Sequence, residues 1–524
     1  MKRIVKIVGY SMLFLVLGTM TVLSQELINS EVARSSENGL TGFSLAVSGG
    51  WAIVSSPQKD VNDKKSLGGV TFYQLTEGQW KIAQEVLPLG ISELGSFGSS
   101  LAIQGNTAVI SATGDHQGGL FSGAVYVYNY DYLQSSWVQV AKLKASDAAI
   151  GKRFGHSVAL KDDIIVVGAY NADGNEIKSG AAYVFQKIEG AWLESQKIYA
   201  ASGKSNDYFG HQVHILDEGN IAIGAYNADG AEERSGAVYV FKNSGSDWIQ
   251  RAKLFDVEGS SSDLFGFSLT SGPRLNIDES TDTYAGTLFI GAPGTNNNNK
   301  QTGSVYFYTE NSAGWNQSLE LIEATSEHND HFGVSISCNS SGNLFVGANR
   351  VNTDSNLNSG TVYLYETFLG QGSSVSQTSE LTVSLINAYD QYGSNISTDE
   401  ENIIIGSPYA DVNGMNNSGT VSFFRMTSII DSALSTSDVY TLEQNVPNPS
   451  NGLTVIRYGL KKAGDVKISV YNIMGQLVEI LVNEYQDFGV YNIPFEKGSH
   501  GTGVYIYKIE VNDFTASKKM ILGN

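Results

Sequence analysis

The strongest constraint on the fold is a β-rich unit of about 55 residues that recurs seven times along the chain. One copy reads FGHSVALKDDIIVVGAYNADGNEIKSGAAYVF, from Phe154 to Phe185, and the copy from Phe209 to Phe241 is closely similar. An aromatic residue opens each copy and a glycine marks a later point in it. The aromatic residues are Phe43, Phe97, Phe154, Phe209, Phe265, Phe332 and Tyr392, and the glycines are Gly69, Gly123, Gly180, Gly236, Gly303, Gly360 and Gly419. Repetition at this length predicts similar structural units packed side by side.

Each unit has room for four short strands. In the copy that opens at Phe154, we expect them at residues 157–160, 164–167, 182–185 and 192–199. The second strand is apolar throughout, as in a strand covered on both faces, whereas the fourth alternates and carries polar residues. This gradient from an inner to an outer strand is typical of a blade with a neighbour on each side. The sequence therefore predicts an all-β protein whose main body is a seven-bladed β-propeller.

The seventh unit lacks a fourth strand. After its third strand, at 421–424, the chain enters a Ser/Thr-rich stretch at 427–439. A strand-like segment at 26–33 stands before the first unit and belongs to no unit of its own. We therefore predict that this N-terminal segment supplies the fourth strand of the last blade. Such closure removes the edges and faces that an open array would expose.

Residues 1–24 have the pattern of a signal peptide. Basic residues at Lys2, Arg3 and Lys6 precede an apolar stretch that ends near Leu23, and cleavage is expected after Ser24. A membrane anchor is the alternative, although the stretch is short for a transmembrane span and is interrupted by polar residues and glycines. No other segment of the sequence is apolar for long enough to cross a bilayer. The expected divisions are a signal peptide at 1–24, the propeller at 25–426, a linker at 427–439 and a C-terminal domain at 440–524.

The repeat resembles the FG-GAP repeat of integrin α-subunit propellers over about residues 25–426. The resemblance lies in the pairing of Phe-Gly with a later Gly-Ala-Pro or a variant of it, as in Gly291-Ala292-Pro293 and Gly406-Ser407-Pro408. It implies calcium loops of the form DxDxDG between the two motifs. This sequence has only a tight turn there in most units, such as Lys161-Asp162-Asp163, which offers too few oxygens for calcium.

The fifth unit carries a longer insertion between its two motifs, at 271–286. Its acidic residues Asp278, Glu279 and Asp282 lack the alternating spacing of a calcium loop. An Asn-x-Asp-Gly run after the second motif, at Asn171–Gly174 and again at Asn227–Gly230, is either a fragment of a calcium loop or an ordinary Asx turn, and we favour the turn. We therefore transfer no calcium site to this chain, and we assign no catalytic, cofactor-binding or metal-binding residue.

Several conspicuous residues recur in phase with the repeat, which indicates a role in the scaffold. Tryptophans begin the fourth strand and are expected to pack between blades: Trp80, Trp137, Trp192, Trp248 and Trp315. Aspartates precede the Phe-Gly motif and are expected to cap a turn by accepting backbone hydrogen bonds: Asp207, Asp263, Asp330 and Asp390.

The C-terminal segment changes in character to short alternating strands, such as 466–471 and 504–511, which predict a small immunoglobulin-like β-sandwich. It is similar to the type A C-terminal sorting domain of the type IX secretion system. The matching marks are Gln444-Asn445, Pro447-Asn448-Pro449, Tyr471-Asn472 with Gly475, Gly503-Val504-Tyr505 and Lys518-Lys519. The resemblance implies recognition by that secretion machinery, and an immunoglobulin-type binding module is the alternative.

The net charge and the sequence motifs argue against several classes of function. A net charge of −20 argues against binding to nucleic acid, whose phosphates would be repelled. No nucleophile elbow, zinc-protease motif, phosphate loop or dinucleotide fingerprint occurs in the sequence. We therefore expect a secreted or cell-surface, non-catalytic binding or adhesion protein, with a protein or a glycan as its ligand.

A secreted enzyme that acts on polysaccharides is the alternative function. It would need acidic and basic side chains gathered in one cleft, for which Asp115, His116, Lys152 and Arg153 are the candidates. Specific function is expected where the repeat is broken, chiefly at 271–286 and in the loops after the second motif.

Overall fold

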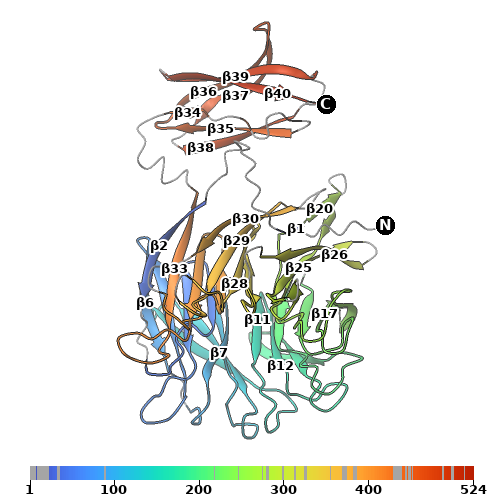
Figure 1. Ribbon diagram of the computed structural model, residues 1–524. Coiled ribbons are helices and arrows are strands. Elements are labelled where there is room, and N and C mark those ends of the chain that lie inside the picture. Colours follow the sequence, from blue (N-terminus) through green and yellow to red (C-terminus); the bar gives the residue numbers. More distant parts are fainter. Residues whose placement is uncertain are drawn as a thin grey trace. The chain divides into compact units, whose positions relative to one another are not determined.

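The computed structural model describes residues 7–8, 23–31, 36–428 and 440–523 (Figure 1). Short internal gaps interrupt these ranges, at 88–89, 217–218, 246, 274, 279–282, 298–299, 312–313, 324–326, 354–355, 369–373, 382–385, 443–444, 446–449, 451–452, 487–488, 497–500 and 513. The chain divides into two compact units, one built on Gln25–Arg425 and the other on Met426–Asn524. The regular elements of the described residues are all strands, as the sequence predicts.

The first unit consists of seven antiparallel sheets, the blades, in chain order. Blade 1 holds β3 (Leu45–Ser48), β4 (Trp51–Ser56), β5 (Gly69–Thr76) and β6 (Gln79–Val86); blade 2 holds β7 (Phe97–Gln104), β8 (Thr107–Ala112), β9 (Ala124–Asp131) and β10 (Ser136–Leu143); blade 3 holds β11 (Ser157–Lys161), β12 (Ile164–Ala169), β13 (Ala181–Ile188) and β14 (Ala191–Ile198); blade 4 holds β15 (Gln212–Ile215), β16 (Ile221–Ala225), β17 (Ala237–Asn243) and β18 (Trp248–Leu254).

The later blades have the same plan with additions. Blade 5 holds β19 (Ser268–Thr270), β22 (Thr287–Ala292), β25 (Ser304–Asn311) and β26 (Gly314–Ile322); blade 6 holds β27 (Phe332–Cys338), β28 (Asn343–Ala348), β29 (Thr361–Phe368) and β30 (Ser374–Leu381); blade 7 holds β31 (Asn395–Thr398), β32 (Asn402–Ser407) and β33 (Thr420–Ser428). Two small hairpins interrupt blade 5, β20 (Leu275–Asp278) with β21 (Thr283–Ala285) and β23 (Asn296–Asn297) with β24 (Lys300–Gln301). A two-residue strand, β1 (Ile7–Val8), pairs in parallel with β26.

The N-terminal segment completes the seventh blade, as predicted. Strand β2 (Leu23–Glu31) lies beside β33, so that the sheet runs β2-β33-β32-β31 (Figure 1). The strand spans the predicted cleavage point after Ser24, and most of the predicted signal peptide lies outside the described residues. Backbone hydrogen bonds also join the first blade to the last, because the N–H groups of Asn38, Leu40 and Thr41 donate to carbonyls of residues 416–418.

Each pair of neighbouring blades is joined by the same backbone contact. The repeated glycine of one blade forms a parallel β-bridge to the first residue of the Phe-Gly motif, or of its equivalent, in the next blade. The seven bridges are Gly68–Phe97, Gly123–Phe154, Gly180–Phe209, Gly236–Phe265, Gly303–Phe332, Gly360–Tyr392 and Gly419–Thr41. The bridge leaves no room for a side chain, since a Cβ at Gly180 would lie 2.1 Å from the carbonyl oxygen of Phe209. The φ of Gly180 is also positive, at 94°, which disfavours any other residue.

These bridges correct two assignments made from the sequence. In blade 1 the bridging glycine is Gly68 rather than Gly69, and the residue that fills the aromatic position is Thr41 rather than Phe43. Gly42 follows Thr41 with a φ of 86°, like the glycine of each Phe-Gly motif. Phe43 instead takes the next position along and is 40% exposed.

Hydrophobic side chains from adjacent blades fill the space between them. One core cluster, for example, joins Val70 and Phe72 of blade 1 to Ile110 and Tyr126 of blade 2. The predicted inter-blade role of the tryptophans is confirmed at this junction, where Trp137 stacks on Phe72 with ring centroids 4.6 Å apart. Blade 7 is joined to blade 1 in the same way, since Trp80 stacks on Phe423 at 5.6 Å.

The in-phase aspartates cap turns, as predicted. In each case one carboxylate oxygen accepts a hydrogen bond from the backbone N–H three residues earlier: Lys204 to Asp207 at 2.8 Å, Ser260 to Asp263 at 2.6 Å, Asn387 to Asp390 at 2.7 Å, and Glu327 to Asp330. These side chains are almost fully buried. Burial raises the pKa of Asp263 and of Asp330 to about 6, because a buried carboxyl group is less stable when charged.

The second unit is a sandwich of two antiparallel sheets, which agrees with the prediction. One sheet contains β34 (Thr441–Leu442), β35 (Leu453–Leu460) and β38 (Gly489–Glu496), and the other contains β37 (Leu477–Gln486), β36 (Gly464–Asn472), β39 (Gly503–Val511) and β40 (Phe514–Leu522). Its core includes the buried Ile456, Tyr458 and Ile468. Two of the quoted marks have structural roles: the Asn445 amide donates to Thr454 at 2.9 Å, and Gly475 turns the hairpin with a φ of 77°.

Removal of residues 25–36 should destabilise the propeller, because β33 would lose its neighbour at the edge of blade 7. Compared with a chain that starts at Gln25, a chain that starts at Glu37 should melt about 10 °C lower. Differential scanning calorimetry measures this difference. Identical melting curves would contradict closure by the N-terminal strand.

Two glycine substitutions distinguish the steric effect of the bridge from the strain of a positive φ. Gly180→Ala should cost about 3 kcal/mol or more, because the new methyl group meets the backbone of Phe209. Gly190→Ala is the matched control, since Gly190 has a similar φ of 85° but nothing within 4 Å of its Cβ position, and should cost only about 1 kcal/mol. Chemical denaturation measures both free energies of unfolding, and equal costs would show that the bridge is not tight.

The raised pKa values of Asp263 and Asp330 predict a pH dependence of stability. A carboxyl group whose pKa is near 6 in the folded state and about 4 when unfolded stabilises the fold below pH 4, and this contribution is lost as the pH rises through 6. The double variant Asp263→Asn, Asp330→Asn should therefore show a smaller fall in melting temperature between pH 4.5 and pH 7 than the unsubstituted chain. Asp63→Asn, at an exposed turn, controls for the loss of a charge. Equal falls in the double variant and the unsubstituted chain would refute the prediction.

Candidate functional site

The loops after the second motif in blades 3 and 4 are held by their own acidic residues. The Asp173 carboxylate accepts a hydrogen bond from the backbone N–H of Lys178 at 2.9 Å and pairs with Lys152 at 2.6 Å. Asp229 accepts from the N–H of Arg234 at 3.1 Å and pairs with Lys204 at 2.5 Å. Hydrogen bonds from the lysines lower the pKa of both carboxyl groups. Both carboxylates accept from the N–H five residues on, so these aspartates hold their loops without making the predicted Asx turn, which would use the N–H two residues on.

The insertion of blade 5 forms the hairpin of β20 and β21. Asp278 lies at the end of β20, whereas Glu279 and Asp282 fall outside the described residues. The described residues contain no group of three or more His, Cys, Asp or Glu side chains arranged to hold a metal ion.

Aromatic residues at two positions of the repeat lie close together in blades 3 to 5. Two positions are involved, the residue after each Phe-Gly motif and the residue after each Gly-Ala motif. In blades 3 to 5 five of these six positions hold aromatic rings, and the sixth holds Pro293; the rings are His156, Tyr170, His211, Tyr226 and Phe267. Tyr208, which precedes the Phe-Gly motif of blade 4, adds a sixth ring. We call these six residues the aromatic array.

The rings of the aromatic array contact one another in an unbroken series across the three blades. His156 packs against Tyr170, with ring centroids 4.4 Å apart, and against His211 at 4.9 Å. His211 in turn contacts Tyr226 at 4.5 Å and Phe267 at 4.8 Å. Tyr208 lies between Tyr170, at 5.5 Å, and Tyr226, at 5.4 Å. All six side chains are half-buried, so each ring still presents part of its surface.

The two histidines of the aromatic array are neutral near pH 7. Burial lowers the pKa of His156 to about 4, with a smaller contribution from the charge of Arg153. Burial also holds the pKa of His211 well below its usual range, and the neighbouring His156 adds to the effect. The aromatic array is therefore an uncharged surface of rings and hydroxyl groups, suited to stacking against apolar or sugar surfaces.

The equivalent positions of the other blades hold small polar residues, proline or valine, apart from blade 1, where Phe43 follows Gly42. In blade 2 they hold Ser99 and Thr113, whose hydroxyl groups hydrogen-bond at 2.9 Å. The amide of Asn349, in blade 6, donates to the hydroxyl of Ser394, in blade 7, at 3.0 Å. Since the scaffold accepts small polar side chains at these positions, the rings of blades 3 to 5 are not required by the repeat. The array was not predicted from the sequence, although the aromatic residues at these two positions of consecutive units are a visible signal for it.

Of the four candidates for an enzymatic site, His116 and Arg153 share one contact, and Asp115 and Lys152 are engaged in others. Asp115 is buried, and its carboxylate accepts hydrogen bonds from the Tyr126 hydroxyl at 2.8 Å and from Lys142 at 3.0 Å. Lys152 pairs with Asp173. His116 and Arg153 both lie against the ring of Phe121, at 5.4 Å and 5.5 Å.

Comparison with known protein families supports both resemblances drawn from the sequence. The FG-GAP repeat family matches residues 87–128, 137–185, 192–241 and 375–424. The secretion system C-terminal sorting domain family matches residues 446–523.

Two curated relatives are integrin alpha-3 proteins. The one from Mus musculus is 25% identical over 240 residues, which cover 44% of this chain and 21% of the integrin. The one from Cricetulus griseus is 29% identical over 142 residues, which cover 26% of this chain and 12% of the integrin. The matched segment is thus about a fifth or less of the length of these relatives.

Solved structures with an overall likeness are only distantly similar. A fungal alcohol oxidase of the AA5 family, in complex with copper, is 11% identical with a TM-score of 0.44, covering 95% of this chain and all of that chain. The acylaminoacyl peptidase of Pyrococcus horikoshii is 9% identical with a TM-score of 0.39, covering 79% of this chain and 57% of that chain. Similarities at this level say nothing about the chemistry of this protein.

The matches to the two families agree with the two folded units. Within the described residues, no helix has the length and apolar character that a membrane crossing requires. The propeller with its repeated glycine bridges corresponds to the FG-GAP matches, and the C-terminal sandwich corresponds to the sorting-domain match. The chain is therefore an FG-GAP repeat propeller with a C-terminal sorting domain of the type IX secretion system, which exports it to the outer cell surface or the exterior.

Proposed function

We propose that this protein is a non-catalytic binding or adhesion protein that engages an extracellular protein or glycan through the aromatic array. The observation that carries the proposal is the unbroken contact of six half-buried rings across blades 3 to 5, whereas blade 2 holds Ser99 and Thr113 at the two repeat positions that supply most of these rings. Rings that the scaffold does not need are available for a ligand.

The chemistry of the aromatic array fits such a role. Aromatic rings contribute large contact areas and lose little conformational entropy on binding, which makes them frequent in interfaces. The ring contacts between His156, His211 and Phe267 fix the surface before a ligand arrives. A surface fixed in advance binds more tightly, since less order has to be imposed on it.

The enzymatic alternative, a polysaccharide-acting enzyme, lacks such support. General acid–base catalysis on a glycosidic bond needs two carboxyl groups that face one cleft. The Asp115 carboxylate is buried against Tyr126 and Lys142, and Lys152 is paired with Asp173. Among the described candidates, these contacts favour a structural role over a catalytic one.

Binding of the purified full chain to a glycan array and to immobilised cell-surface proteins tests the proposal. A double variant, Tyr170→Ala with Tyr226→Ala, should weaken binding to any ligand so identified by about tenfold or more, because two stacking surfaces are lost. Tyr132→Ala is the matched control, since Tyr132 is exposed on blade 2 outside the aromatic array, and it should bind normally.

Two outcomes would contradict the proposal. Unchanged binding by the folded double variant would place the ligand elsewhere on the protein. Release of new reducing ends from a polysaccharide incubated with the unsubstituted chain would establish the enzymatic alternative.

A further inference from the structure

The fourth strands of blades 1 to 4 carry glutamine and alanine in alternation at one equivalent position. The register fixes the equivalence, because in each strand this residue directly follows the β-bulge against the third strand. The four residues are Gln84, Ala141, Gln196 and Ala252. Since the backbone frame is constant, the change from glutamine to alanine removes a carboxamide group from an otherwise equivalent place.

In blades 1 and 3 this glutamine holds the tryptophan near the start of the fourth strand of the next blade. The Gln84 side chain accepts a hydrogen bond from the N–H of Trp137 at 2.7 Å and donates one to its carbonyl oxygen at 3.0 Å. Gln196 makes the same two bonds to Trp248, at 2.6 Å and 3.1 Å. Both tryptophans are buried, with 3% and 5% of their surface exposed. A primary carboxamide suits this place because its acceptor oxygen and one of its N–H donors lie on the same side of the group.

In blades 2 and 4 the alanine cannot make these bonds, and the tryptophan of the next blade is only half-buried. Ala141 and Trp192 pack at the edge of one core cluster, and Ala252 and Trp315 pack at the edge of another. Each of these tryptophans lines a hollow beside the outer strands. The Trp192 hollow, between blades 2 and 3, has a volume of about 440 Å³, and the Trp315 hollow, between blades 4 and 5, has one of about 520 Å³. Both hollows therefore lie at junctions where alanine replaces the glutamine.

The backbone groups of the two half-buried tryptophans point outward from the sheet, as those of Trp137 do. Lys187 lies opposite Trp192 and donates its own N–H, at 2.9 Å, to the segment before the second strand. Glu310, opposite Trp315, does the same at 2.9 Å. Each pair is therefore of the kind that exchanges no hydrogen bonds, so the N–H and C=O of the tryptophan face away from the third strand. The groups that a glutamine binds at Trp137 are thus presented in the same direction at the two hollows.

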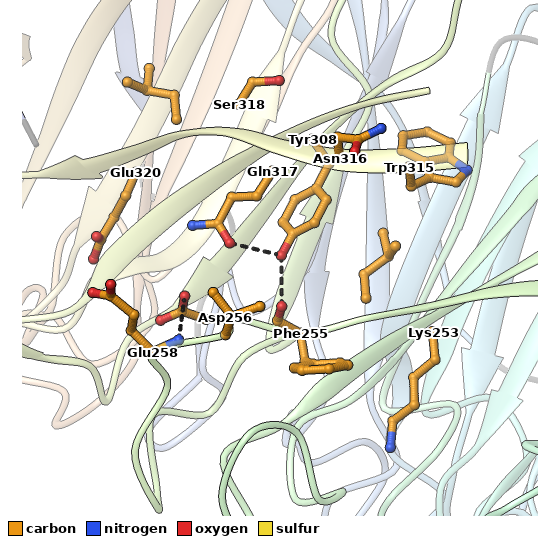
Figure 2. A pocket seen from close by; sticks show the side chains of 13 residues that line it. Lys253, Phe255, Asp256, Glu258, Tyr308, Trp315, Asn316, Gln317, Ser318 and Glu320 are labelled. Atoms are coloured by element: carbon orange, nitrogen blue, oxygen red, sulfur yellow. Dashed lines mark hydrogen bonds between the residues drawn. The ribbon is translucent and has the colours of Figure 1, made fainter. Parts of the chain in front are cut away.

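The walls of the two hollows differ in their polar side chains but share the tryptophan. Figure 2 shows the Trp315 hollow, with the Trp315 ring at one end and Tyr308 nearer the middle. The Tyr308 hydroxyl donates to the Gln317 side chain at 3.2 Å (Figure 2). In the other hollow the equivalent of Gln317 is Glu194, whose carboxylate accepts hydrogen bonds from the backbone N–H of Ser146 at 2.8 Å and from its hydroxyl at 2.7 Å. These wall groups bond within the protein, whereas the half-buried tryptophan is common to both hollows.

We propose that the Trp192 hollow and the Trp315 hollow each bind the primary carboxamide of a glutamine side chain on a protein partner. The chain itself shows the fit, because Gln84 and Gln196 fill the equivalent place at the other junctions. The tryptophan ring offers an apolar surface for the stem of the incoming side chain.

The acetamido group of a sugar matches these sites less well. In a trans secondary amide the N–H and C=O point in opposite directions, so one such group cannot pair with both backbone groups of a tryptophan. The two hollows lie beside the outer strands of blades 2 to 5, and the residues that line them are not those of the aromatic array. They are therefore binding sites beyond the proposed adhesion surface.

Titration of the full chain with the peptide acetyl-Gly-Gly-Gln-Gly-Gly-N-methylamide, followed by ligand-observed NMR, tests the proposal. The N-methylamide end keeps the glutamine as the one primary carboxamide of the peptide. The peptide should bind, and replacing its glutamine by norleucine should lower the affinity by about tenfold, because the stem remains while two hydrogen bonds are lost.

A double variant, Ala141→Gln with Ala252→Gln, should occupy both tryptophans from within, as at the other junctions. It should bind the peptide about tenfold or more weakly, and it should melt about 2 °C higher than the unsubstituted chain because hydrogen bonds are gained. If the double variant fails to fold, the single variants Ala141→Gln and Ala252→Gln serve, and each should lose one of the two sites.

Ala83→Gln is the matched control, since Ala83 is exposed on the fourth strand of blade 1 and lines neither hollow, and it should leave peptide binding unchanged. Failure of the glutamine peptide to bind would overturn the proposal, as would equal affinity for the norleucine peptide or full binding by the folded double variant. Binding of an N-acetylglucosamine trimer that the double variant abolishes would overturn the assignment to a protein partner. The array variant, Tyr170→Ala with Tyr226→Ala, should still bind the peptide, and loss of binding there would place the peptide on the array instead.

Discussion

The close approach of a glycine in one blade to the backbone of the next is the contact on which the propeller depends. It recurs at seven junctions, from Gly68–Phe97 to Gly419–Thr41, and it admits no side chain. The contact fixes the distance between neighbouring blades, so that apolar residues from both, such as Phe72 and Trp137, can fill the space between them. Because each junction repeats the same geometry, the ring closes only if the last junction is made like the others, and the N-terminal segment makes it.

Much of this architecture is encoded locally and could be predicted from the sequence. The glycine and aspartate series are in phase because each satisfies a backbone requirement within its own unit, and the missing fourth strand of blade 7 revealed the role of the N-terminal segment. Both wrong assignments concern blade 1, where the residue type suggested a position in the repeat that the residue does not occupy. Blade 1 has two adjacent glycines, and its only aromatic residue near the motif, Phe43, is two residues beyond the position that Thr41 fills. The bridge to Gly419 identifies Thr41 as the residue at that position, and this bridge exists only because the ring is closed.

The candidate site was less predictable because it depends on residues far apart in the chain. The aromatic array joins rings of three blades, each of which looks unremarkable within its own unit. The array nevertheless follows one rule: the backbone frame is constant, and a side chain that departs from it at an equivalent position is free to take on a specific function. The sorting domain complements this design, since it delivers the propeller to the exterior, where such surfaces meet their ligands.

The central claim is that the seven junctions are equivalent and that the ring is closed. Hydrogen exchange of the backbone amides that make the junctions tests it most directly, because an amide exchanges when its junction opens. The N–H of Thr41, bonded to Ser418, should be protected to within about tenfold of the N–H of Phe97, Phe154, Phe209, Phe265, Phe332 and Tyr392, which make the same bond at the other junctions. Exchange of Thr41 that is faster than the others by several orders of magnitude would show an open ring and would contradict the account.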